Sequence, residues 1–100
     1  MKKISLIFLL ALICFSCSNE KKRYVIGVSQ CSEDIWRNKL NTELKMSGYH
    51  YDNVELKFAS ANDNDKLQIE QINKFVNDGV DLLIISPNQV NTISSAINRA

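Results

Sequence analysis

Glycine, proline and histidine are scarce in this 100-residue sequence, and their scarcity excludes several classes of function. The three glycines, Gly27, Gly48 and Gly79, are too far apart for a Gly-x-Gly-x-x-Gly or Walker-type phosphate loop, which disfavours a nucleotide-dependent enzyme. The single histidine, His50, lies in a polar segment that predicts a solvated side chain, and the cysteines show no metal-site spacing. We therefore expect no catalytic function, no metal and no cofactor in residues 1–100.

Excess charge of either sign is also missing. The sequence has 12 basic and 11 acidic residues, and without Lys2 and Lys3 the net charge becomes −1. The one basic cluster, residues 21–23, lies in a polar stretch typical of a solvated linker. A nucleic-acid groove needs clustered positive charge. No nucleic acid is therefore expected among the partners.

The longest apolar run lies at the N-terminus. Lys2 and Lys3 precede a run over residues 4–15 that only Ser5 interrupts. This length fits the hydrophobic region of a signal peptide and falls short of the roughly 20 residues that a bilayer-spanning helix needs. Residues 1–16 are therefore predicted to be an export signal, and the rest of the chain to be periplasmic.

The junction that follows this segment resembles the lipobox of bacterial lipoproteins. Cys17 comes directly after the small residue Ser16, although Cys14 and Phe15 depart from the usual leucine-rich positions. The resemblance implies that Cys17 is acylated and that residues 17–23 tether the protein to a membrane. Ordinary cleavage near Ser16 and retention as an uncleaved anchor are the alternatives. Loss of Cys14 with the signal and acylation of Cys17 would leave Cys31 without a disulfide partner in the mature segment, as a small apolar residue at a strand end.

From residue 24 onward, the pattern alternates between strands and helices. Apolar, β-rich runs at 24–28, 54–58 and 80–85 predict three strands. Three apolar stripes at helical spacing follow them: Trp36, Leu40 and Leu44; Ile69, Ile72 and Val76; and Ile93, Ala96, Ile97 and Ala100. Ser32 is the predicted N-cap of the first helix, and Gly48 and Gly79 are the predicted ends of the first two.

This βαβαβα order predicts an α/β fold, with a parallel sheet between helices on both faces in three layers. We expect the strand order 2-1-3, with the strand at 24–28 in the middle. Three strands and three helices bury little apolar surface for an independent domain. Residues 24–100 are therefore expected to be the incomplete N-terminal part of a larger domain.

Ligands of open parallel sheets bind at the carboxyl ends of the strands. The loops there are residues 29–35, 60–64 and 86–89, and each begins with a serine. Most of their polar side chains are neutral hydrogen-bonding groups, which suit a neutral polyhydroxy ligand.

Several segments resemble the type I periplasmic binding proteins, particularly the ribose and galactofuranose binders. They are Val-Ile-Gly-Val-Ser-Gln at 25–30, Trp36-Arg37, Gln68-Ile69 and Gly-Val-Asp-Leu-Leu-Ile-Ile-Ser-Pro at 79–87. In that family, two α/β lobes joined by a hinge close over a sugar. The resemblance implies that this chain is the first half of the N-terminal lobe of a sugar-binding domain.

The resemblance also implies which residues bind the sugar. Trp36 takes the position of an aromatic ring against the sugar, and Arg37 that of an arginine that reaches its oxygens. The family often has an aspartate in the second loop, where this chain has Ser60 or Ala61. The expected ligand-binding residues are Ser29, Gln30, Glu33, Trp36, Arg37, Ser60, Asn62, Ser86, Asn88 and Gln89.

Each of these assignments has a structural alternative. The helical stripe alone would place Trp36 in the core, and Arg37 could pair with Glu33 on the helix surface. Residues 62–65 could be read as a calcium loop, but they lack the spaced glycine and distal glutamate of an EF-hand, so a turn and helix cap is the better interpretation.

Three hypotheses apply to the whole protein. The domain is the sensing input of a hybrid two-component histidine kinase, or a lipoprotein that delivers sugar to the permease of an ATP-driven transporter, or part of a repressor that shares the fold. An export signal argues against the repressor. We favour the sensor by analogy with sugar-responsive receptors.

Overall fold

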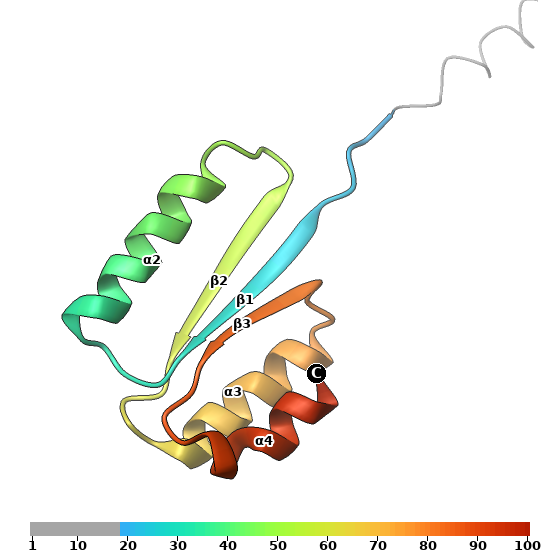
Figure 1. Ribbon diagram of the computed structural model, residues 1–100. Coiled ribbons are helices and arrows are strands. Elements are labelled where there is room, and N and C mark those ends of the chain that lie inside the picture. The colour runs from blue at the N-terminus through green and yellow to red at the C-terminus, as the bar shows by residue number, and fades with distance from the viewer. Residues whose placement is uncertain (1–18) are drawn as a thin grey trace, which may run out of the picture.

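The computed structural model describes residues 19–100 and shows the predicted alternation of strands and helices (Figure 1). The predicted signal segment, residues 1–16, and the predicted lipidation site, Cys17, lie outside the described residues. The elements are β1 (Tyr24–Gln30), α2 (Ile35–Gly48), β2 (Val54–Ser60), α3 (Asp65–Asn77), β3 (Leu82–Ser86) and α4 (Val90–Arg99).

The three strands form one parallel sheet in the order β2-β1-β3, which confirms the predicted topology. In the register of the sheet, Gln30 at the end of β1 lies between Ser60 of β2 and Ser86 of β3. Because the strands run in the same direction, their carboxyl ends meet at one edge. We call this edge, with the loops 31–34, 61–64 and 87–89, the carboxyl edge.

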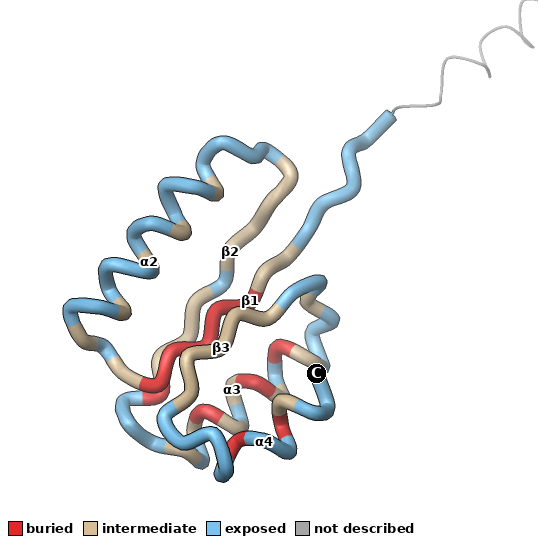
Figure 2. The backbone as a smooth tube through the Cα atoms, viewed as in Figure 1, coloured by how far each residue is buried: buried red, intermediate tan, exposed pale blue. Residues whose placement is uncertain are grey.

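The helices form the outer layers, with α2 on one face of the sheet and α3 and α4 on the other (Figure 1). The core lies on the α3 and α4 side, where Ile72, Ile93 and Ala96 are buried. The partly buried Ile69, Leu83, Ile85 and Ile97 pack around them. In Figure 2 the buried backbone runs through β1 and along the facing sides of α3 and α4. The α2 helix has no fully buried residue.

The predicted N-cap of α2 is wrong, and its C-terminal end at Gly48 is correct in position but not in conformation. The N-cap of α2 is Asp34, not Ser32, because the Asp34 carboxylate accepts a hydrogen bond from the backbone N–H of Arg37 at 2.9 Å. Gly48 does not adopt the left-handed conformation expected of a helix stop, whereas Gly79 does, with φ 72°. Gly48 instead lets α2 approach β2, since a Cβ there would lie 2.9 Å from Cδ1 of Leu56.

No helix within residues 19–100 combines the length and the apolar character that crossing a bilayer requires.

Candidate functional site

Backbone hydrogen bonds join the three loops of the carboxyl edge. The amide of Cys31 donates to the carbonyl of Ser86 at 3.0 Å, and the amide of Ala61 donates to the carbonyl of Gln30 at 2.9 Å. The amide of Asp63 donates to the carbonyl of Cys31 at 2.7 Å. The loop after β1 is thereby fixed to both of its neighbours, so the predicted site residues belong to one connected region.

The second loop is a turn followed by a helix cap, as predicted. Asn62 and Asp63 have φ values of 48° and 62°, a left-handed conformation that Asn and Asp tolerate better than most residues. The side chain of Asn64 accepts from the backbone N–H of Leu67 at 3.0 Å and caps α3. In the described part of the chain, no group of three or more His, Cys, Asp or Glu side chains is placed to hold a metal ion.

Trp36 is exposed at the carboxyl edge and does not belong to the core. It lies in the first turn of α2 with 80% of its surface exposed, and its neighbour Ile35 is 79% exposed. Of the other two residues in the predicted stripe, Leu40 is exposed and Leu44 is half-buried, where it lines a cavity together with Ile26. An indole ring that solvent reaches so fully is available to a ligand.

Arg37 lies one residue further along α2 and pairs with the helix cap. Its guanidinium donates to the Asp34 carboxylate, so Arg37 pairs with Asp34 and not with Glu33, the alternative partner that the sequence left open. The backbone N–H of Arg37 and then its guanidinium hold the pKa of Asp34 below its ordinary value. Because Asp34 balances its charge, Arg37 can contact neutral oxygens without requiring an anionic ligand.

Three of the predicted site residues carry a buried polar atom that has no hydrogen-bond partner among the described residues. These atoms are Gln30 Oε1, Arg37 Nε and Ser60 Oγ, and two further such atoms lie on α3. Gln30 faces α2, where its Nε2 donates to Asn41 Oδ1 at 3.0 Å, and Ser60 shares that face as its partner in the register. Buried polar groups are almost always paired, so these atoms are candidates to pair with a ligand.

The other predicted site residues are distributed around this group. Ser29 is fully buried on the opposite face, where its hydroxyl accepts from Gln68 Nε2 at 3.2 Å. Ser86 is half-buried, whereas Glu33, Asn62, Asn88 and Gln89 are exposed on the loops. Sequence reasoning gave no role to Asn41, which orients Gln30, or to the hydrogen bonds of Gln68. For Asn41, the sequence gave one signal, its position one helical turn after Arg37. For the hydrogen bonds of Gln68, it gave none.

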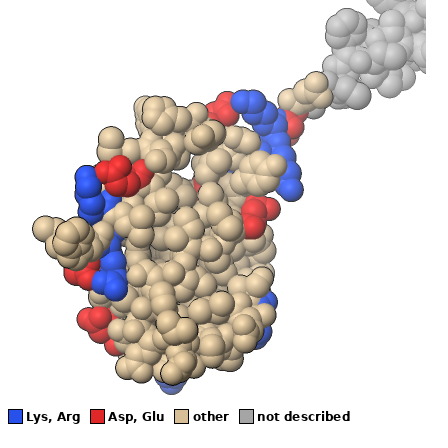
Figure 3. Space-filling model, in the orientation of Figure 1, with Lys and Arg blue, Asp and Glu red and all other residues tan. Residues whose placement is uncertain are grey.

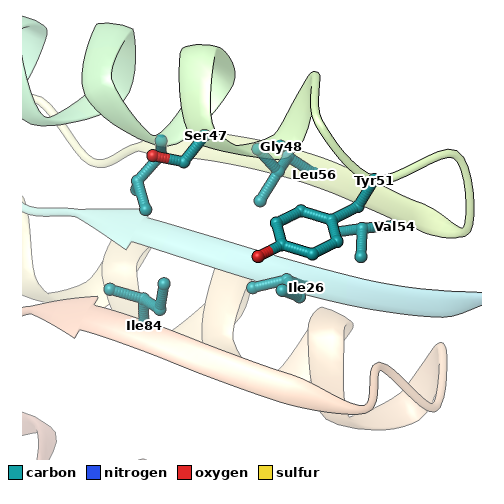
Figure 4. A pocket seen from close by; sticks show the side chains of 8 residues that line it. Ile26, Ser47, Gly48, Tyr51, Val54, Leu56 and Ile84 are labelled. Carbon is teal, nitrogen blue, oxygen red and sulfur yellow. The ribbon is translucent and has the colours of Figure 1, made fainter.

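An apolar cavity lies elsewhere in the described part of the chain. It has a volume of about 210 Å³ between α2 and the sheet. Its lining residues are Ile26, Leu44, Ser47, Gly48, Tyr51, Val54, Leu56 and Ile84. Ile26, Val54 and Leu56 lie in the first halves of β1 and β2, and Figure 4 shows the Tyr51 ring pointing toward Ile26. With few polar groups to pair with hydroxyls, this cavity does not suit a sugar.

The charges on the surface also fit a neutral ligand. On the face shown in Figure 3, basic side chains gather where the chain enters β1 and around α2, where acidic ones accompany them. The ion pairs include Arg23 with Glu55 at 2.8 Å and Lys39 with Glu43 at 2.7 Å. No broad field of one sign covers this face.

Neither a protein-family model nor a curated protein matches the sequence. Among solved structures, the chain is similar to the fructose-binding periplasmic domain of the hybrid two-component system BT1754, with 38% identity and a TM-score of 0.76, over 78% of this chain and 26% of that one. It is also similar to an ABC transporter solute-binding protein from Bacillus halodurans C-125 with bound myo-inositol. The identity is 23% and the TM-score 0.72, over 81% of this chain and 28% of that one.

A third similar structure is the periplasmic binding component of the arabinose ABC transporter from Shewanella sp. ANA-3, bound to L-arabinofuranose. The identity is 29% and the TM-score 0.59, over 75% of this chain and 26% of that one. The chain thus spans about a quarter of the length of these structures.

The described residues therefore have the fold of the type I periplasmic binding proteins. Their β2-β1-β3 sheet and alternating helices correspond to the first half of the N-terminal lobe, as the sequence predicted.

Proposed function

We propose that this chain binds a neutral small sugar, a monosaccharide or short oligosaccharide, at the carboxyl edge of its sheet in the periplasm. The observation that carries the proposal is the exposed Trp36 beside Arg37, in the first turn of the helix that follows the loop after β1. Saturable binding of fructose, myo-inositol or L-arabinose by the full-length protein, measured by calorimetric titration, would support the proposal. A folded protein that binds none of these or any other neutral sugar would contradict it.

The chemistry of the site matches the two sides of a sugar. The C–H groups on one face of a sugar ring pack well against the π-face of an indole such as Trp36. The hydroxyls need donors and acceptors, and the unpartnered atoms Arg37 Nε, Ser60 Oγ and Gln30 Oε1, on the α2 side of the sheet, would supply them once a bound sugar has displaced the groups that cover them. Glu33, Asn62, Asn88 and Gln89 extend this polar surface along the loops.

We infer further that the domain is the sensing input of a membrane-bound two-component receptor. In support, the identity to a domain of a hybrid two-component system is 38%, against 23% and 29% to the two transporter proteins. The alternative is a lipoprotein that delivers the sugar to a transporter permease. A membrane-spanning helix and a kinase domain encoded downstream would support the sensor, whereas a gene that ends after the second lobe would contradict it.

Acylation of Cys17 remains part of the proposal, because it would hold either kind of protein at the membrane. We expect the Cys17→Ala substitution in the full-length protein to abolish incorporation of labelled fatty acid. Equal labelling of the variant and the parent would contradict a lipid anchor at this residue.

Arg37→Lys tests the polar half of the site. The ammonium of lysine cannot reproduce the two-pronged hydrogen bonding of the guanidinium, so sugar affinity should fall about tenfold. Thermal stability should hardly change, since lysine can still pair with Asp34. Arg23→Lys is the matched control, because Arg23 pairs with Glu55 near the amino end of the sheet. Calorimetric titration of both variants measures their sugar affinities. An affinity of Arg37→Lys equal to that of the parent would show that Arg37 does not belong to the site.

A further inference from the structure

Gln68 forms three hydrogen bonds beneath the carboxyl edge. Its side chain is fully buried in α3, and Nε2 donates to Ser29 Oγ at 3.2 Å and to the carbonyl of Ser86 at 3.0 Å. Its Oε1 accepts from the backbone N–H of Asn88 at 3.1 Å. A carbonyl can only accept and an amide N–H can only donate, so these partners determine the orientation of the Gln68 amide.

The hydrogen bonds continue from the third loop to the second. Asn88 Nδ2 donates to Asp65 Oδ1 at 2.8 Å and to the carbonyl of Asp63 at 3.4 Å. Through Asn88, Gln68 therefore connects the end of β3 to the turn after β2. Through Ser29, it connects the same loops to the end of β1. We call Ser29, Gln68 and Asn88 the loop clamp.

The burial of Ser29 shows which side of the sheet the loop clamp occupies. Ser29 has no exposed surface and faces α3, whereas Gln30 faces α2 and the helix that carries Trp36. A ligand that contacts Trp36 and Arg37 from solvent cannot reach the Ser29 hydroxyl without opening the α3 side. The contribution of Ser29 to the site must then pass through the residue to which it is bonded.

We propose that Gln68 is a positioning residue of the sugar site, and that Ser29 acts through Gln68 without touching the ligand. The expected effect of Gln68 on sugar affinity rests on the proposed function. The effect of Gln68 on the conformation of the loops does not depend on any ligand. Gln68 holds the backbone of the third loop in place, so that the exposed Asn88 and Gln89 are presented in a fixed position at the carboxyl edge.

Hydrogen exchange of the full-length protein without sugar tests the clamp. Gln68→Met keeps the length of the side chain but removes all three hydrogen bonds. The amide of Asn88 should exchange about tenfold faster or more, because it loses its acceptor. The amides in the middle of β1 should keep their protection. Ile72→Val, in the same helix and equally buried but without a polar contact, is the control and should leave Asn88 unchanged.

Unchanged exchange of Asn88 in Gln68→Met would overturn the inference. If Gln68→Met does not fold, Ser29→Ala is the milder variant, since it removes one of the three bonds. It should accelerate the exchange of Asn88 by a smaller factor, and no acceleration would equally contradict the clamp.

A double-mutant cycle then tests how Ser29 acts. Ser29→Ala, Gln68→Met and the double variant are titrated with whichever of fructose, myo-inositol and L-arabinose the parent binds. If Ser29 acts through Gln68, Ser29→Ala weakens binding in the parent and has no further effect in Gln68→Met. The same fold-loss in both backgrounds would show that Ser29 touches the ligand directly. If the parent binds no sugar, the proposed function fails, while the exchange of Asn88 still decides on the clamp.

Discussion

Replacing Trp36 by alanine is expected to weaken sugar binding about thirtyfold, or roughly 2 kcal/mol, without lowering the melting temperature. The loss in affinity follows from removal of an aromatic face that a bound sugar would desolvate. Stability should not change, because 80% of the Trp36 surface is exposed and little packing is lost. Calorimetric titration of the full-length protein, paired with thermal melts, measures both quantities.

Tyr49→Ala is the matched control for Trp36. Tyr49 is also an exposed aromatic residue, 92% accessible, but it follows the far end of α2. Its removal should leave both sugar affinity and melting temperature as they are in the parent. A Trp36→Ala protein with a lowered melting point and parent-like affinity would refute the assignment of Trp36 to the site.

Ile72→Ala is expected to have the largest effect on stability, with a loss of about 2–5 kcal/mol in the free energy of unfolding. Ile72 has no exposed surface and packs with Ile93 and Ala96 between α3 and α4. Truncation removes buried apolar area and leaves a cavity that the rigid core fills only in part. Denaturant unfolding of the full-length protein measures the loss, provided that the transition is two-state.

Met46→Ala is the control for this core variant, because Met46 lies on α2 with 61% of its surface exposed. Its effect should stay within about 0.5 kcal/mol, as for most surface substitutions. A loss below about 1 kcal/mol in Ile72→Ala would contradict the position of the core on the α3 and α4 side of the sheet.

The fold was predictable because its signals are local and repeat along the chain. Short apolar runs at 24–28, 54–58 and 80–85 alternate with stripes of helical period, and parallel strands need such helical connections. The strand order 2-1-3 followed from the general placement of ligand loops in open sheets, and the structure confirms it.

The errors have identifiable physical causes. Ser32 and Asp34 are both good N-cap residues, and only the tertiary position of the loop after β1 selects Asp34. α2 does end at Gly48, but without the left-handed turn, because this glycine serves the close approach of Leu56 from β2. Neither the N-cap residue of α2 nor the conformation of Gly48 can be predicted from the neighbouring residues in the sequence alone.

The edge at which the three loops meet was predictable, but the arrangement of the side chains there was not. The topology placed its loops at one edge, but the exposure of Trp36 depends on how α2 lies on the sheet, and the helical stripe alone suggested burial. The loop clamp depends on contacts between distant residues, since Gln68 and Ser29 are 39 positions apart. Alternation along β1 could indicate that Ser29 and Gln30 face opposite sides, but not which side faces the ligand.

A crystal structure of the full-length protein grown with its sugar tests the central claim most directly. The account predicts a sugar ring against the Trp36 indole, with hydroxyls hydrogen-bonded to the Arg37 guanidinium and to side chains of the loops after β1, β2 and β3. A sugar bound away from the carboxyl edge, for example in the apolar cavity between α2 and the sheet, would contradict it.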